Sequence, residues 1–267
     1  MSDDKQGTDT KYGQIHRRLF EGKAAVFAIA TTVAISIGGI VEIVPMFTAS
    51  SASWERGDWV TPYTPLEVAG RDIYIREGCY LCHSQMVRPM RAEILRYGDW
   101  TRAAEYQYDR PFLLGSRRLG PDVQRLGGKY PDAWHYEHMR DPRSTSPGSV
   151  MPPYPWLLTD KIDAADIAAS VRALARVGTP YAATDDASVE ASLRDQAQGI
   201  VASLEASGIT SEWDDEIIAM IAYLQRLGVD GTTYLQARDR SDEGGDRWTP
   251  SCERPERPWP WDGSPAS

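Results

Sequence analysis

Two cysteines and a histidine lie close enough together to hold one prosthetic group, in the segment Cys79-Tyr80-Leu81-Cys82-His83. On a helix, the two thiols and the imidazole, at positions one, four and five of the segment, share one face. Thiols with this spacing add to the vinyl groups of haem, and the imidazole then meets the iron from the same side. We therefore predict one covalently bound haem c, attached at Cys79 and Cys82, with His83 as an axial ligand of the iron.

A zinc-binding or redox-active cysteine pair is the competing interpretation of this segment. A structural zinc site needs two further ligands at related spacing, and the sequence has no second Cys/His pair. A thioredoxin-like pair would follow a strand of an α/β domain, and no pair of strands with hairpin signals is present. The third cysteine, Cys252, lies alone in a polar tail and is interpreted as an unpaired surface thiol.

The second axial ligand comes from a methionine or a histidine, and this choice strongly affects the potential of a haem. The candidates are Met86, Met90, Met139, Met151, His135 and His138. Met86 and Met90 are expected to leave the same helix as His83, so they cannot easily reach its opposite side. Met151 lies in a proline-stiffened loop, Met-Pro-Pro-Tyr-Pro, whose rigid backbone would hold the iron geometry constant in both redox states. We predict Met151 as the second ligand.

A turn between these two ligands, Leu119-Gly120-Pro121, could support the histidine. The glycine permits a close approach of the backbone, and the proline fixes the turn while its carbonyl stays free. That carbonyl could accept the Nδ1 proton of His83, which would fix the tautomer and raise the basicity of the ligand. A plain surface turn is the alternative interpretation.

Helices are expected to position these residues, and no strands are expected. Thr64, Pro65 and Glu67 form a helix start with a capping box, and this helix is predicted to run into the cysteine motif. Further helices are predicted from 160 to 177, with Thr159 as the cap, and from 211 to 227. An exposed helix is expected from 185 to 207, and the tail from 231 to 267 is predicted to be irregular.

One membrane-spanning helix is predicted near the N-terminus, over residues 23–47. The run is apolar except for Glu42 and is longer than the core of a signal peptide. Glu42 lies either at the outer interface or against a neighbouring membrane subunit. Arg17 and Arg18 precede the run, so the positive-inside rule places residues 1–22 in the cytoplasm and residues 48–230 outside. The net charge of −9 argues against a nucleic-acid partner.

Several longer motifs resemble the mono-haem cytochrome c subunit, subunit II, of cbb3-type haem-copper oxidases. The motifs are Gly78 to Pro89, Gly120-Pro121-Asp122, the run from Gly127 to His135, and the run from Met151 to Leu157. The resemblance covers roughly residues 15–230. It implies an all-α chain with a single transmembrane helix followed by a class I cytochrome c domain, to which a segment near 179–210 adds a helical insertion.

The resemblance also implies a function and partners. Electrons would pass from a di-haem cytochrome c subunit through this haem to the catalytic subunit with its b-type haems and copper. There oxygen is reduced to water with proton pumping. The chain would lie in the bacterial inner membrane, in contact with lipid, with its cytochrome domain in the periplasm. A cytochrome bc1 complex or a soluble cytochrome c is a further expected partner.

The resemblance carries residue roles as well. Cys79, Cys82, His83 and Met151 match the family's haem-binding positions, while Arg88, Arg125 and His135 are expected to serve the haem propionates or a subunit interface. Two alternative functions stay open at this point: a free-standing, membrane-anchored cytochrome that shuttles electrons, and an assembly subunit whose haem is structural.

Overall fold

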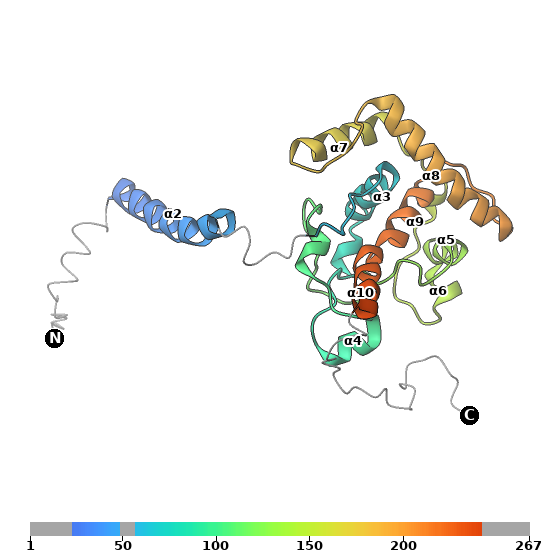
Figure 1. Cartoon of the computed structure of the whole chain (residues 1–267), viewed down its shortest axis with the longest axis horizontal. Helices are drawn as coiled ribbons and strands as arrows, with labels where there is room; N and C mark the ends of the chain where they lie inside the picture. The colour runs from blue at the N-terminus through green and yellow to red at the C-terminus, as the bar shows by residue number, and fades with distance from the viewer. Residues whose placement is uncertain (1–22, 49–56, 242–267) are drawn as a thin grey trace, which may run out of the picture. The chain divides into compact units, whose positions relative to one another are not determined.

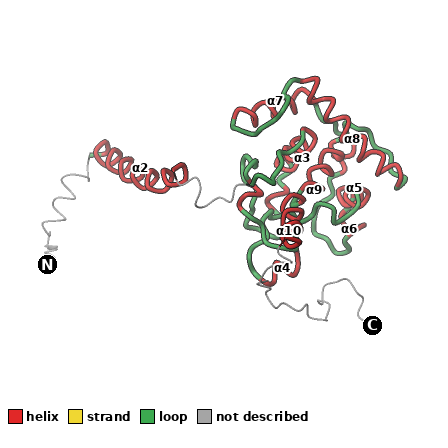
Figure 2. Tube along the Cα trace, in the orientation of Figure 1, coloured by secondary structure: helices red, strands yellow, loops and turns green. Residues whose placement is uncertain are grey.

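The computed structural model describes residues 23–48 and 57–241. The chain divides into two compact units, Met1–Arg56 and Gly57–Ser267, which are treated separately. Helices account for the regular structure of the described residues, and Lys161 and Asp215 form an isolated bridge between two extended segments (Figure 2). The predicted all-α fold class is confirmed.

Helix α2 (Ala24–Thr48) is the described part of the first unit. Its stretch Ala24–Val44 is long and apolar enough to cross a membrane, and none of that stretch is buried inside the protein. Large apolar side chains such as Ile35 and Val41 are about two-thirds exposed. An exposed apolar helix of this length suits a lipid surrounding. The prediction of one N-terminal apolar helix is confirmed, whereas Arg17 and Arg18 lie outside the described residues.

Helix α3 (Pro65–Arg76) opens the core of the second unit with the predicted cap. The Thr64 side chain accepts a hydrogen bond from the Glu67 amide, and the Glu67 carboxylate accepts one from the Thr64 amide. Both partners are local, so the start of this helix is set by sequence alone. The helix ends sooner than predicted, because Gly78 adopts a left-handed conformation with φ of +71°.

Helices α3 and α9 (Glu216–Arg226) lie side by side at the centre of the second unit (Figure 1). Their backbones meet at Gly70, where an added Cβ would lie 2.0 Å from the Ala219 carbonyl oxygen. The apolar residues of α9 are buried, but the helix starts at Glu216 rather than at the predicted residue 211. The reason is that the Asp215 carboxylate accepts hydrogen bonds from Ser211 and Glu212, which hold the preceding residues in a turn.

Helices α7 (Ala164–Arg176) and α8 (Asp186–Ala206) pack against this pair. The predicted cap at Thr159 is wrong: the Asp163 carboxylate accepts the Ala165 amide proton instead. The backbone just before Asp163 cannot be helical, because the Ile162 amide donates to the Asp214 carbonyl in an extended pairing.

Helix α8 begins and ends one residue inside the predicted range of 185–207, but one of its faces is not exposed. Val189, Leu193 and Leu204 are at most 1% exposed and belong to the same hydrophobic core as α3 and α9. The segment 179–210 therefore contributes to the core of the domain.

The remaining elements are short and surround the core. They are η1 (Cys79–Leu81), α4 (Arg91–Tyr97), η2 (Ala103–Tyr106), α5 (Asp132–Arg140), α6 (Pro142–Thr145) and η3 (Pro155–Leu158). The last described element, α10 (Val229–Ser241), is helical where an irregular tail was predicted. Contacts distant in sequence hold this helix, since Asp230 accepts the Thr61 amide proton at 2.7 Å and Tyr234 stacks on Trp59.

Candidate haem-binding site

The cysteine motif lies on a single turn of 3-10 helix, and not on a continuation of α3. The amides of Cys82 and His83 both donate to the carbonyl of Cys79, at 3.1 and 2.9 Å. This shared acceptor keeps the two thiols and the imidazole within one turn, as their predicted role requires. Cys79 is buried and Cys82 is half-buried, and neither forms a disulfide. Burial raises the pKa of the Cys79 thiol to about 12.

The imidazole of His83 faces the turn at Gly120-Pro121. Its Nδ1 lies 2.8 Å from the Pro121 carbonyl oxygen, so the prediction for this turn is confirmed. An added Cβ on Gly120 would lie 2.2 Å from Cε1 of the imidazole, and only glycine allows so close a backbone. Because Nδ1 donates to this carbonyl, Nε2 is the nitrogen available to a metal ion.

Backbone hydrogen bonds hold the turn against the residues that follow the motif. The Gly120 amide donates to the Cys82 carbonyl at 3.0 Å, and the Val123 amide donates to the Ser84 carbonyl at 2.9 Å. These two bonds flank the contact between His83 and Pro121. The imidazole is thus oriented by a backbone that is itself fixed on both sides.

The Met151 loop lies close to the segment that precedes the cysteine motif. The Trp156 indole donates to the Glu77 carboxylate at 3.1 Å, only two residues before the first cysteine. The Tyr154 amide donates to the Met139 carbonyl at 2.8 Å. Met151 itself is half-buried and packs against the core cluster that contains Cys79. The structure therefore brings the loop of the predicted second ligand to the end of α3 that carries the motif.

The other sulfur candidates are placed differently. The chain from His83 to Met90 is not helical, so the expectation that Met86 and Met90 continue one helix with His83 is wrong. The Met86 amide is bound to the Asp122 carboxylate, and Met90 is 47% exposed just before α4. Met139 is buried in the core on α5.

The two histidine candidates both lie on α5. His135 is buried, and burial lowers its pKa to about 4, which keeps the ring neutral. Its Nε2 has no hydrogen-bond partner among the described residues. His138 stacks on Trp134, with ring centroids 4.6 Å apart, and its Nδ1 lies 2.6 Å from the Thr145 hydroxyl. Burial and, to a lesser extent, electrostatic repulsion from His83 lower the pKa of His138 to about 4.

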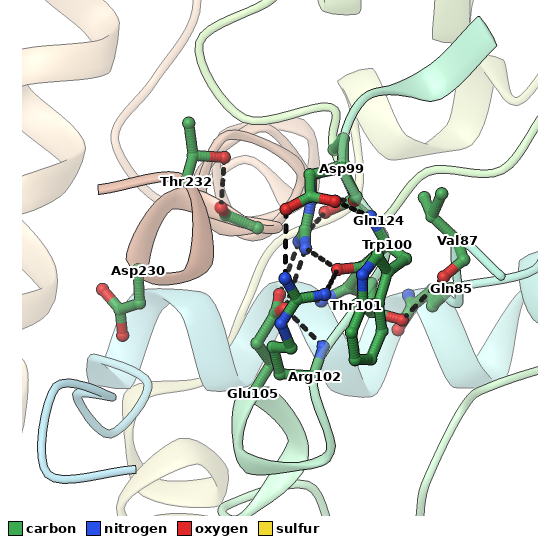
Figure 3. A network of polar contacts seen from close by, with 12 residues as sticks. Gln85, Val87, Asp99, Trp100, Thr101, Arg102, Glu105, Gln124, Asp230 and Thr232 are labelled. Atoms are coloured by element: carbon green, nitrogen blue, oxygen red, sulfur yellow. Dashed lines mark hydrogen bonds and ion pairs between the residues drawn. The ribbon is translucent and has the colours of Figure 1, made fainter. Parts of the chain in front are cut away.

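Arg125 does not fit the expected role at the haem propionates or an interface. Its guanidinium binds both oxygens of the Glu105 carboxylate, at 2.5 and 2.8 Å, and both side chains are at most 6% exposed. It also donates to the carbonyls of Asp99 and Trp100. Its partners Asp99, Trp100 and Glu105 are labelled in the polar network of Figure 3. A fully paired, buried guanidinium has no donor left for a propionate. Sequence reasoning could not predict the pairing of Arg125 with Glu105, since Glu105 lies 20 residues away.

Arg88, unlike Arg125, is partly exposed to solvent. The Arg88 side chain is 42% exposed and pairs with Glu93 at 3.1 Å, so it stays accessible to a further anionic partner.

Leu119 and Val150, which precede Gly120 and Met151 respectively, are 73% and 82% exposed. Apolar side chains beside both predicted ligand segments suit a large, flat, apolar group such as a porphyrin.

The donor set fits a haem better than a zinc ion. The motif supplies two free thiols and one oriented imidazole with an available Nε2, which is what covalent haem attachment needs. In the described part of the chain, no three or more His, Cys, Asp and Glu side chains are grouped to hold a metal ion. The described residues thus offer no complete ligand set for structural zinc at this motif.

Comparison with known proteins agrees with this donor set. Residues 16–230 match the model of the family described as cytochrome c oxidase, mono-haem subunit/FixO. No match was found among curated proteins. The matched range covers most of the chain and contains the cysteine motif, the Pro121 turn and the Met151 loop. The chain therefore belongs to the FixO family of mono-haem cytochrome c oxidase subunits, which corresponds to subunit II of the cbb3-type enzymes.

Proposed function

We propose that this chain is the electron-relay subunit of a cbb3-type oxidase, with one haem c attached at Cys79 and Cys82 and its iron bound by His83 and Met151. The contact between His83 Nδ1 and the Pro121 carbonyl carries this proposal, because it orients an imidazole for metal binding right beside the two thiols. Family membership supplies the oxidase context. A bound haem supplies iron that takes up and releases one electron.

The protein's own contribution is to hold the ligands rigidly. Pro121 fixes the tautomer of His83 and raises the electron-donating strength of its Nε2. The prolines at 152 and 153 restrict the backbone next to Met151, and the Trp156 indole ties this loop to Glu77. The geometry of rigidly held ligands changes little between the two redox states of the iron, and a small change in geometry favours fast electron transfer.

The oxidase complex provides the donor and the acceptor. We infer that a di-haem cytochrome c subunit delivers electrons and that the catalytic haem-copper subunit accepts them, reduces oxygen and pumps protons. Helix α2 would anchor the chain in the bacterial inner membrane, with the cytochrome domain in the periplasm. The basic residues Arg17, Arg18 and Lys23 before the helix support a cytoplasmic N-terminus. A cytochrome bc1 complex or a soluble cytochrome c would supply electrons to the complex.

Covalent attachment is tested with one double cysteine variant and one single control variant. Full-length protein is separated under denaturing conditions and stained for haem peroxidase activity. We expect the Cys79→Ala and Cys82→Ala variants together to abolish the stain, since both thioether bonds are then absent. Cys252→Ala is the matched control and should keep it. A stain that survives the double replacement would refute attachment at this motif.

The second ligand is tested by replacing Met151 with leucine, which is similar in volume and has no sulfur. The oxidised protein should lose its methionine–iron charge-transfer band, its haem potential should fall strongly, and oxygen consumption should stop. Met90→Leu, at an exposed methionine, is the control and should leave all three unchanged. A charge-transfer band that persists after Met151→Leu would assign the ligand elsewhere. Normal oxygen consumption with a lost band would instead indicate a structural haem.

The complex itself is tested by extraction in mild detergent. Purification through a tag on this chain should bring down subunits that contain b-type haem and copper. If the chain purifies alone with its haem and still exchanges electrons with other carriers, it is a free-standing shuttle, and the relay-subunit proposal is wrong.

A further inference from the structure

A cluster of polar side chains lies behind the turn that contacts His83. It consists of Ser84, Glu93, Arg118 and Asp122, which we call the Arg118 clamp. The Asp122 side chain is fully buried, and those of Glu93 and Arg118 are 9% and 17% exposed. The Arg118 guanidinium lowers the pKa of the Glu93 carboxyl, so this pair is charged. The family assignment does not explain why so many charges are buried here.

Arg118 connects the clamp to the residues that follow His83. Its Nε donates to the Ser84 hydroxyl at 2.7 Å, and one of its Nη atoms donates to the Met86 carbonyl at 2.8 Å. The same guanidinium donates to Glu93 at 2.8 Å. The planar fork of arginine can serve these directions at once, whereas the single nitrogen of lysine cannot.

Asp122 connects the clamp to the turn itself. One of its oxygens accepts from the Ser84 hydroxyl at 2.7 Å and from the Met86 amide at 2.9 Å. The other accepts from the Gln124 amide at 2.9 Å. Asp122 directly follows Pro121, so these bonds fix the position of the Pro121 carbonyl relative to the segment that begins at His83.

We propose that Arg118 and Asp122 are positioning residues that set the strength of the hydrogen bond from His83 Nδ1 to the Pro121 carbonyl, and thereby the potential of the haem. This inference rests on the proposed function. The clamp holds the donor segment and the acceptor turn together from behind, at a contact that spans 38 residues of sequence.

The direction of the effect separates positioning from plain electrostatics. A weaker bond at Nδ1 makes His83 a poorer electron donor to the iron, which favours the reduced state and raises the potential. Deleting a nearby positive charge has the opposite effect, because it favours the oxidised, more positive iron and lowers the potential. In a variant without the Arg118 charge, the two effects shift the haem potential in opposite directions.

The experiment is a redox titration of the full-length, haem-bearing chain in detergent. Arg118→Lys keeps the charge but loses the fork, and Arg118→Met loses both. We expect both variants to raise the ratio of reduced to oxidised haem at fixed ambient potential, by up to about tenfold, which is about 59 mV for a one-electron couple. Ser84→Ala removes one bridging hydroxyl and should shift the ratio in the same direction by less. This milder variant keeps the test valid if Arg118→Met fails to fold.

A second readout follows the hydrogen bond directly. In the reduced protein, proton NMR reports the exchange of the His83 Nδ1 proton with solvent, which should become faster in the same variants. Glu105→Gln is the matched control: it weakens another buried arginine–carboxylate pair without touching the clamp, and should change neither the ratio nor the exchange. An unchanged ratio in Arg118→Lys, or a fall in Arg118→Met, would overturn the proposal.

The outcome for the unaltered chain keeps this proposal separate from the proposed function. If the unaltered chain carries no covalent haem, the proposed function fails. If the unaltered chain carries haem and the clamp variants change neither the ratio nor the proton exchange, as expected for Glu105→Gln, the clamp is purely structural. The proposed function then stands.

Discussion

Replacing Gly70 with alanine tests whether the crossing of α3 and α9 holds the domain together. The new Cβ would lie 2.0 Å from the Ala219 carbonyl oxygen and 2.7 Å from Tyr223 Cβ. Real Cβ atoms essentially never come within 3.0 Å of another atom, so the two helices would have to separate by about 1 Å. A gap of that size forfeits roughly a quarter to a half of each dispersion contact along the crossing.

The magnitude follows from two opposing terms. Overpacking against a backbone atom costs about 3 kcal/mol, because the carbonyl cannot rotate aside as a side chain could. The higher helix propensity of alanine stabilises the folded state by about 1 kcal/mol. The net loss is therefore about 2 kcal/mol, or a fall in Tm of roughly 4–8 °C for a domain of this size.

Gly199→Ala is the matched control, since it makes the same substitution inside another helix. Gly199 is exposed on α8, and an added Cβ there would meet nothing within 4 Å. Only the propensity gain of about 1 kcal/mol applies, so Tm should rise by about 2–4 °C. The assay is thermal unfolding of the full-length chain in detergent, followed by circular dichroism at equal haem content. If Gly70→Ala is as stable as Gly199→Ala, the close crossing of α3 and α9 is wrong.

Three further tests, with four variants, address other parts of the domain. Burial raises the pKa of Asp109 to about 6 from about 3.8, so this group's contribution to stability is lost as the pH rises through that range. Asp109→Asn should flatten the dependence of the urea midpoint between pH 4 and pH 7, and an unchanged slope would contradict the shift. Asp163→Ala should cost about 1 kcal/mol in urea unfolding as the cap of α7, whereas Thr159→Ala should cost only a few tenths. Arg125→Met leaves Glu105 buried without its partner and should cost about 3–5 kcal/mol; a loss below 1 kcal/mol would contradict the buried pair.

Features that depend on neighbouring residues were predictable from sequence. The capping box at Thr64 needs a partner only three residues away. The apolar run of α2 is long enough to be identified by composition alone.

Predictions failed where distant segments compete for the same backbone. Thr159 is a good cap by residue type, yet the pairing of Ile162 with Asp214 keeps that stretch extended and moves the helix start to Asp163. Helix α10 has no apolar period of its own, and its contacts with Thr61 and Trp59 support it instead. Intrinsic preference is a weak term that tertiary contacts override.

The cysteine motif shows the division most clearly. Sequence by itself determined the set of donor groups, because two thiols and an imidazole within five residues are held together by the covalent chain. Tertiary structure decided how His83 is oriented and supported, since the Pro121 carbonyl and the Arg118 clamp reach it from tens of residues away. Tertiary structure also removed Arg125 from the site by pairing it with Glu105. The pairing of Arg125 with Glu105 spans 20 residues of sequence, and no local pattern of residues encodes it.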